Sequence, residues 1–149
     1  MIIARNISET VKFAQALAKL VKPGDVLLFE GDLGTGKSTL IREMIQTLMN
    51  DKVDVPSPTF TLVQTYDSPR AQLWHFDLYR LEHPDEVLEL NIDDAFHQGI
   101  SFVEWPDRLG YLKPEDTLLI ELAHGKQPDE RTITLTPSKT WSSRLEGLA

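Results

Sequence analysis

Apolar residues follow two patterns along this chain, namely short continuous runs and recurrence at every third or fourth position. Residues 26–29 (VLLF) form one run and residues 100–104 (ISFVE) a second, mostly apolar one. Such runs are typical of strands that are buried on both faces. From residue 8 to residue 21 the apolar residues instead recur at helical spacing, which predicts a helix with Ser8 or Asn6 as its N-cap. Both kinds of element therefore occur early in the chain.

The same reasoning places elements along the rest of the chain. Two pairs of strand-like segments are separated by turn-forming residues and predict β-hairpins, at 59–67 with 72–80 and at 117–122 with 131–136. The other expected elements are a short strand at 1–6, a helix at 39–49, a stiff loop at 50–58, a helix that starts at 84–86, and a short helix within 138–149. Strands that alternate with helices indicate an α/β fold with a mixed sheet.

A glycine-rich segment lies between the first buried strand and the helix at 39–49. Residues 31–38 (GDLGTGKS) fit G-x-x-x-x-G-K-[ST], the phosphate-binding loop of P-loop NTPases. Glycines let backbone N–H groups surround phosphates, and the helix N-terminus adds partial positive charge. Lys37 supplies a cation for the β- and γ-phosphates, and the Ser38 hydroxyl is a ligand for Mg²⁺. The expected phosphate-contacting residues are Gly34, Thr35, Gly36, Lys37, Ser38 and Thr39.

The motif and the predicted elements together specify a fold class. We expect an α/β, P-loop NTPase-type three-layer fold with a mixed, largely parallel central sheet plus β-hairpins. The 149 residues suit one domain, and no repeat, low-complexity segment or linker divides them. We therefore expect a single P-loop NTPase domain over residues 1–149 that binds a nucleoside triphosphate and Mg²⁺.

Composition narrows the possible partners. The chain has 23 acidic and 15 basic residues, a formal net charge of −8, and no cysteine. An acidic chain is a poor candidate for binding a nucleic acid backbone alone, so we expect any nucleic acid to be met through a partner. The absence of cysteine excludes disulfides and thiolate metal sites and suits a reducing cytosol. No apolar run approaches the length of a membrane span, so no membrane contact is expected.

Two carboxylates are candidates for the second acidic position that a P-loop NTPase needs at a strand end. Asp77 ends the segment LWHFD, and Glu104 ends the strand at 100–104. Either residue could instead be a solvated or ion-paired carboxylate. Glu104 has the better context because its strand is apolar on both faces, as central strands are. His75, in the same segment as Asp77, is expected to be a hydrogen-bonded core residue rather than a catalytic base.

A second polar segment, residues 57–61 (SPTFT), presents hydroxyl groups on a rigid loop. Such a loop could sense a γ-phosphate as switch segments do, although from the residues alone hydroxyls that cap the backbone are favoured. Residues 107–110 (DRLG) match D-x-x-G, but no N-K-x-D for guanine recognition occurs, and we interpret them as a loop.

Four motifs occur in the order and at the spacing found in one family. Residues 31–39 (GDLGTGKST) resemble its phosphate-binding loop, G-D-L-G-A-G-K-T-T, and its other signatures resemble SPTFTLV at 57–63, HFDLYR at 75–80 and EW at 104–105. The chain thus resembles the TsaE family of bacterial ATPases, from its first helix to its last hairpin. The departures are mild: Thr35 replaces Ala, Ser38 replaces Thr, and Asn91 stands where Gly is common, a position where Asn tolerates a left-handed turn.

The resemblance implies a function. Family members are cytoplasmic, bind ATP and Mg²⁺, and hydrolyse ATP slowly. They act with TsaB and TsaD, the pair that transfers a threonylcarbamoyl group to adenosine 37 of tRNA, and tRNA is met only through that complex. The alternative is a small-molecule kinase of the P-loop class. A kinase needs a lid, often basic, that excludes water, and this chain has no basic insertion and is short for a core plus a lid.

The resemblance also assigns roles to individual residues. Ser38 and Glu104 would ligate Mg²⁺ directly or through water, and Asp77 would lie beside the γ-phosphate. Together with Lys37, the two carboxylates are the expected catalytic residues. The other residues that the resemblance brings to the site are Thr59 in a switch-like loop, Trp105, Arg131 near the nucleotide, and Ser8 or Thr10 near the adenine. A surface charge at the hairpin tip is the alternative for Arg131.

Overall fold

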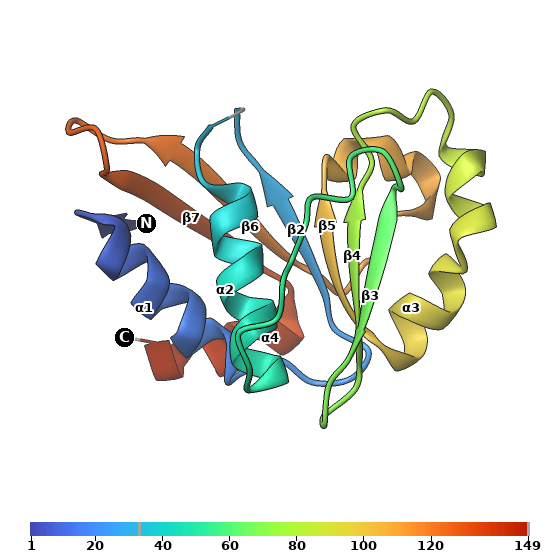
Figure 1. Ribbon diagram of the computed structural model, residues 1–149, viewed down its shortest axis with the longest axis horizontal. Coiled ribbons are helices and arrows are strands. Elements are labelled where there is room, and N and C mark those ends of the chain that lie inside the picture. Colours follow the sequence, from blue (N-terminus) through green and yellow to red (C-terminus); the bar gives the residue numbers. More distant parts are fainter. Residues whose placement is uncertain (33, 149) are drawn as a thin grey trace.

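The computed structural model describes residues 1–32 and 34–148, so Leu33 of the predicted phosphate-binding loop lies outside the described residues (Figure 1). Seven strands of the described chain form one mixed sheet in the order β1-β7-β6-β2-β5-β4-β3. Their bounds are β1 (Ile2–Ala4), β2 (Val26–Glu30), β3 (Val63–Asp67), β4 (Gln72–Asp77), β5 (Ile100–Glu104), β6 (Leu118–His124) and β7 (Arg131–Pro137).

The centre of the sheet is parallel and its margins are antiparallel. Strands β6, β2, β5 and β4 run parallel to one another, whereas β3 pairs antiparallel with β4, and β7 pairs antiparallel with both β6 and β1. Both predicted hairpins are therefore confirmed, and so is a mixed sheet with a parallel centre.

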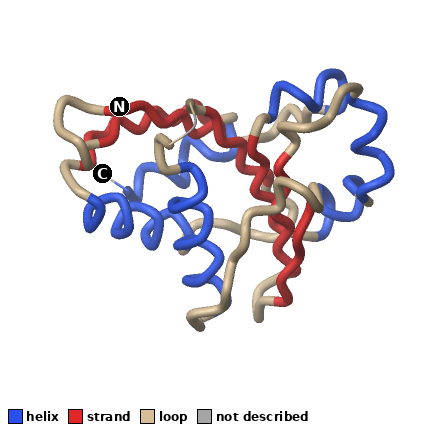
Figure 2. Tube along the Cα trace, turned by 45° about the horizontal axis from the view of Figure 1, so that its top comes forward, coloured by secondary structure: helices blue, strands red, loops and turns tan. Residues whose placement is uncertain are grey.

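Helices cover both faces of this sheet, which confirms the predicted three-layer fold (Figure 2). One face carries α1 (Ile7–Ala18) and α2 (Lys37–Met49). The other carries the 3-10 helix η1 (Pro84–Leu90), α3 (Ile92–Gln98) and the 3-10 helix η2 (Pro106–Leu112). No helix of the described ranges is long and apolar enough to span a membrane.

Strand β2 shows why the apolar runs predicted buried strands. Leu27 and Phe29 are fully buried on the face covered by α1 and α2, and Val26 and Leu28 are buried on the opposite face. Successive side chains of a strand point to opposite faces, so a strand between two helical layers needs apolar residues at every position. The run VLLF therefore occupies the middle of the sheet.

Several predicted boundaries differ from the structure. The expected strands at 59–67 and 72–80 are shortened to β3 and β4, because turns occupy residues 59–62 before β3 and residues 79–80 after β4. The N–H of Leu62 donates to the Pro58 carbonyl at 2.6 Å, and Leu62 has a left-handed φ of 69°. The helix expected from residue 84 is divided into η1 and α3 by Asn91, whose φ is 58°. The N-cap of α1 is Asn6 rather than Ser8, since the Asn6 side chain accepts a hydrogen bond from the Glu9 N–H at 2.9 Å.

The last α-helix is α4 (Lys139–Leu145), and it is followed by the short 3-10 helix η3 (Glu146–Leu148). The Arg144 guanidinium donates to both oxygens of Asp25, at 2.6 and 2.9 Å, and lies 4.0 Å from the centroid of the Trp141 ring. The hydrogen bonds to Asp25 raise the pKa of Arg144 despite its partial burial. A helix that the sequence placed only within 138–149 is therefore tied to the start of β2.

Candidate nucleotide-binding site

A cavity of about 570 Å³ opens where β2, β5 and β4 end and α2 begins. Ligand sites of open α/β sheets lie at this carboxyl edge of the parallel strands. The volume is within the range of about 300–1,000 Å³ that is usual for small-molecule sites. The lining residues that the sequence predicted as site residues are Thr10, Gly34, Gly36, Lys37, Ser38, Thr39, Thr59, Asp77, Glu104, Trp105 and Arg131.

The loop between β2 and α2 has the backbone conformation that its glycines permit. Gly34 and Gly36 have φ values of 84° and 101°, in the left-handed region that favours glycine. Gly36 is also the N-cap of α2, and having no side chain it leaves the N–H groups of the first helical turn uncapped. Backbone N–H groups at a helix N-terminus form a site suited to anions.

Lys37 is held at the base of this loop. Its side chain is almost fully buried, its Nζ donates to the Gly31 carbonyl at 2.6 Å, and the same ammonium lies 4.1 Å from the centroid of the Trp105 ring. Trp105 has a left-handed φ of 58°, and its ring packs against Tyr79 at 4.9 Å between centroids. The cation is therefore positioned beside the glycine loop by a carbonyl dipole and an aromatic face.

The two candidate carboxylates lie next to each other. Asp77 and Glu104 are register partners at the ends of β4 and β5, and both are buried, with 6% and 4% exposure. Asp77 accepts hydrogen bonds from the Thr59 hydroxyl at 3.0 Å and from the Tyr79 N–H at 3.1 Å. The sequence left open which of the two carboxylates belongs to the site. In the structure both of them line the same cavity.

The loop at 57–61 faces the cavity, which corrects the favoured interpretation of its hydroxyls. Ser57 and Thr59 both line the cavity, and their hydroxyl oxygens are 2.7 Å apart. Because Thr59 also donates to Asp77, a hydrogen-bonded chain connects this loop with the end of β4. The hydroxyls therefore join the site rather than cap the loop's own backbone.

Arg131 connects the second hairpin with the phosphate-binding loop. Its Nε donates to the Thr35 carbonyl at 2.9 Å, and its Nη1 donates to the carbonyls of Pro128 and Glu130 at 2.8 and 2.9 Å. The Thr35 side chain is buried and donates to the Asp32 carbonyl at 2.7 Å, and Thr35, a predicted phosphate-contacting residue, is not one of the lining residues. Arg131 thus lies at the cavity and is more than a surface charge at a hairpin tip.

Of the two candidates on α1, only Thr10 lines the cavity. Ser8 is exposed and is not one of the lining residues. Residues two positions apart on a helix point in very different directions, so one segment cannot bring both to the same wall.

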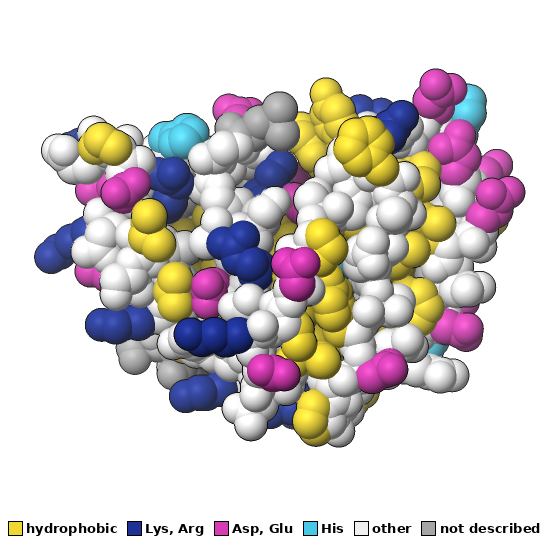
Figure 3. All heavy atoms as spheres, in the orientation of Figure 1, with side chains coloured by type: hydrophobic (Ala, Val, Ile, Leu, Met, Phe, Trp, Pro, Cys, Tyr) yellow, Lys and Arg dark blue, Asp and Glu magenta, His cyan; other side chains and the backbone are white. Residues whose placement is uncertain are grey.

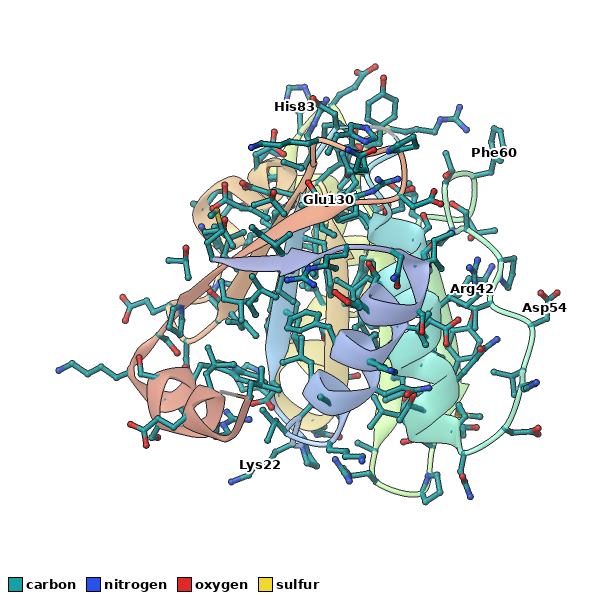
Figure 4. The ribbon with its side chains drawn as sticks, turned by 90° about the vertical axis from the view of Figure 1, so that its left-hand side faces the viewer. Lys22, Arg42, Asp54, Phe60, His83 and Glu130 are labelled. Carbon is teal, nitrogen blue, oxygen red and sulfur yellow. The ribbon has the colours of Figure 1, made fainter. Side chains whose placement is uncertain are left out.

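Three lining residues were missed by the sequence reasoning, namely Ile7, Arg42 and Asp129. Arg42 lies one turn after Ser38 on α2, on the side toward the loop that carries Asp54 and Phe60 (Figure 4). Its i+4 spacing from Ser38 is a signal that could have identified it. Asp129 comes from the hairpin loop, and only the tertiary fold brings that loop to α2.

The oxygen donors of the cavity fit a magnesium ion that arrives with a nucleotide. The Ser38 hydroxyl and the carboxylates of Asp77 and Glu104 are hard ligands of the kind that Mg²⁺ prefers. Within residues 1–32 and 34–148, no group of three His, Cys, Asp or Glu side chains is arranged to hold a metal ion alone. Mg²⁺ is commonly held by one or two carboxylates together with substrate phosphates and water, which matches this donor set.

Comparisons with known proteins agree with the resemblance. Residues 4–133 match the family model described as "Threonylcarbamoyl adenosine biosynthesis protein TsaE". A protein of Bacillus subtilis named tRNA threonylcarbamoyladenosine biosynthesis protein TsaE is 40% identical over 132 residues, which cover 88% of this chain and 81% of the relative. A Rickettsia felis protein of the same name is 39% identical over 112 residues, covering 75% of this chain and 66% of the relative.

The fold is similar to a solved structure as well. The crystal structure of Bacillus subtilis YdiB superimposes with a TM-score of 0.83 at 33% identity, covering 99% of this chain and 91% of that chain. The family match covers most of the chain, and residues of all four family motifs line the cavity. This chain belongs to the TsaE family of threonylcarbamoyl adenosine biosynthesis proteins.

Proposed function

We propose that this protein is a Mg²⁺-dependent ATPase, slow when alone, that acts in the cytoplasm with TsaB and TsaD in the modification of tRNA adenosine 37. The observation that carries the proposal is the meeting of Lys37, Ser38, Asp77 and Glu104 at one cavity beside the N-terminus of α2. Phosphoryl-transfer sites need a cation, a hydroxyl and a carboxylate at such a helix end.

The phosphate-binding loop would hold the triphosphate by backbone N–H groups at the start of α2. Lys37 would exchange the Gly31 carbonyl and the Trp105 face for the β- and γ-phosphates, since an ammonium is attracted more strongly by a full negative charge than by a neutral carbonyl or ring. Mg²⁺, when bound, neutralises charge that develops on the phosphates. Ser38 and Glu104 are the residues that would hold it.

Asp77 is suited to position the water that attacks the γ-phosphate. Its carboxylate is buried, and one hydrogen bond to each oxygen fixes its orientation, from Thr59 on one side and from the Tyr79 N–H on the other. Orienting the nucleophile is the main task left to protein side chains in phosphoryl transfer. Thr59 would also connect the state of the γ-phosphate with the loop at 57–61.

We expect the two carboxylates to fail in different ways when neutralised. Glu104→Gln should raise the Mg²⁺ concentration needed for half-maximal turnover by about 10–100-fold, because a partner of the metal is lost, while ADP still binds. Asp77→Asn should lower kcat by about 10²-fold or more through loss of water positioning. Steady-state ATPase assays over a Mg²⁺ series measure both effects.

The matched control is Glu121→Gln, an exposed carboxylate on β6, which should leave both quantities unchanged. Equal loss of nucleotide binding in Glu104→Gln and Asp77→Asn, whether or not Mg²⁺ is present, would mean that the two carboxylates are structural.

A protein partner is favoured over direct tRNA binding by the surface at the cavity rim. Phe60 is 83% exposed and Tyr79 47% exposed, and the Arg80 guanidinium lies 5.0 Å from the centroid of the Phe60 ring. Figure 3 shows apolar side chains gathered at the top of this face, beside basic ones. Exposed aromatic and arginine side chains are enriched at protein interfaces. The net charge of −8 disfavours binding of a nucleic acid phosphate backbone by this chain alone.

The partner proposal predicts that this chain alone does not shift labelled tRNA in a mobility assay at physiological salt. It also predicts that ATP with Mg²⁺ changes the affinity for a TsaB–TsaD pair, measured by calorimetry, because nucleotide at the Thr59–Asp77 contact alters the rim that carries Phe60. A ligand can shift such an equilibrium only by its differential affinity for the two states. Tight binding of tRNA by the isolated chain would refute the partner proposal. So would an affinity for the TsaB–TsaD pair that is the same with and without nucleotide.

A further inference from the structure

A buried histidine contacts one of the two site carboxylates directly. His75 is 2% exposed in the interior of β4, and its Nε2 lies 2.8 Å from the Glu104 Oε2 on β5. In the register of the two strands His75 faces Phe102, and the residue opposite Glu104 is Asp77. The imidazole therefore reaches diagonally, from within the sheet up to the carboxylate at its edge.

The hydrogen bonding of the ring shows which nitrogen donates to Glu104. A carboxylate can only accept, so Nε2 must carry the hydrogen in the contact with Glu104. The other ring nitrogen, Nδ1, is buried and has no hydrogen-bond partner in the described part of the chain. The contact with Glu104 therefore accounts for the side-chain hydrogen bonding of the ring in the described residues.

A histidine at this place needs an explanation, because the surrounding positions of β4 are apolar. Leu73 and the register partner Phe102, on the same face of the sheet as His75, are fully buried, and burying a polar ring among apolar side chains has a cost unless its hydrogen bond has a use. The one hydrogen bond that His75 makes to another side chain in the described residues goes to Glu104.

We propose that His75 is a positioning residue that holds the Glu104 carboxylate by Oε2 and leaves Oε1 for the magnesium site. This inference rests on the proposed function, in which Glu104 helps to hold Mg²⁺. The same principle operates at Asp77, which is fixed by Thr59 and the Tyr79 N–H. Outer partners that orient a metal's ligands commonly affect metal affinity or activity by about 10–100-fold when they are lost.

The experiment compares His75→Leu, which removes the donor, with His75→Gln, whose side-chain amide N–H can replace Nε2–H. Binding of a fluorescent ATP analogue is titrated with Mg²⁺, and then repeated in EDTA. We expect His75→Leu to raise the Mg²⁺ concentration needed for half-maximal binding of the analogue by about tenfold or more. In His75→Gln this concentration should return substantially toward the wild-type value. Binding in EDTA should stay at the wild-type level in both variants.

The control is Ser101→Ala, which changes an equally buried polar residue of β5 whose hydroxyl has no hydrogen-bond partner in the described residues. It should leave the Mg²⁺ dependence unchanged. Wild-type Mg²⁺ dependence in folded His75→Leu would overturn the proposal, and so would equal defects in the Leu and Gln variants. The proposed function fails separately, when Glu104→Gln itself has no effect on Mg²⁺.

A measurement on the unmodified protein keeps the proposal testable if His75→Leu does not fold. Nitrogen-15 NMR of histidine side chains reports which ring nitrogen carries the hydrogen. We expect a hydrogen on Nε2 of His75, with the resonance identified by its disappearance in His75→Gln. A hydrogen on Nδ1 alone would contradict the donation to Glu104 and overturn the proposal.

Discussion

Lys37→Ala is expected to lower the rate of ATP hydrolysis by about 10²–10³-fold, equivalent to about 2.7–4 kcal/mol of transition-state stabilisation. The reason is that Lys37 is the buried cation beside the glycine loop, already oriented by the Gly31 carbonyl and the Trp105 ring. A preorganised donor of this kind acts on charge as it develops on the phosphates, without reorganisation at the moment of reaction.

The measurement is kcat/KM for ATP at saturating Mg²⁺, with thermal unfolding recorded in parallel to verify the fold. Lys113→Ala is the matched control, because Lys113 is an exposed lysine at the end of η2, outside the cavity lining. It should hydrolyse ATP at the wild-type rate. If Lys37→Ala also did so, the assignment of residues 31–38 as a phosphate-binding loop would be wrong.

Trp141→Ala is expected to reduce the free energy of unfolding by about 3–5 kcal/mol, the usual cost of removing a large buried aromatic side chain. Trp141 is 1% exposed and belongs to the core on the α1 and α2 side of the sheet. Its loss would also remove the ring on which Arg144 lies while that residue binds Asp25. Domains have total stabilities of about 5–15 kcal/mol, so this one side chain would account for a large share.

Urea unfolding followed by circular dichroism measures the change, and Thr140→Ala, at an exposed position of the same helix, is the control. Trp141→Phe should lose less, because an aromatic ring still fills part of the space. Trp141 lies beyond residue 133, where the family match ends, and outside the cavity lining. Nucleotide affinity of the folded Trp141→Ala protein should therefore stay near wild type. If Trp141→Ala lowered the free energy of unfolding by less than about 1 kcal/mol, which is close to the effect of a surface substitution, α4 would not be part of the core.

Features built from one continuous segment were predictable from the sequence. The strand β2, the glycine loop and the helix α2 are consecutive, and their conformations depend on local apolar runs, on glycine's access to positive φ and on helix periodicity. The two hairpins and the central position of β5 follow from similar local signals. The left-handed turn at Asn91 also agrees with its residue type, although the sequence did not reveal that it would divide a helix.

Contacts between distant segments required the tertiary structure. The sequence indicated Asp77 and Glu104 as separate candidates, but only the parallel pairing of β4 with β5 makes them neighbours. The same pairing brings His75 to Glu104, a relationship that no spacing in the chain encodes. Local composition does not specify which strand lies next to which, because strand order depends on the packing of the whole sheet.

The wall of the cavity is the clearest case of such a non-local feature. It combines Thr10 of α1, Arg42 of α2, Thr59 of a loop and Asp129 of a hairpin, which come from four separate parts of the chain. The direction of each side chain depends on how its element rotates against the sheet, and this is why Thr10 lines the cavity whereas Ser8 does not. The sequence by itself determined the glycine loop and the elements around it, because those are local. The tertiary packing decided which carboxylates, hydroxyls and cations meet at that loop.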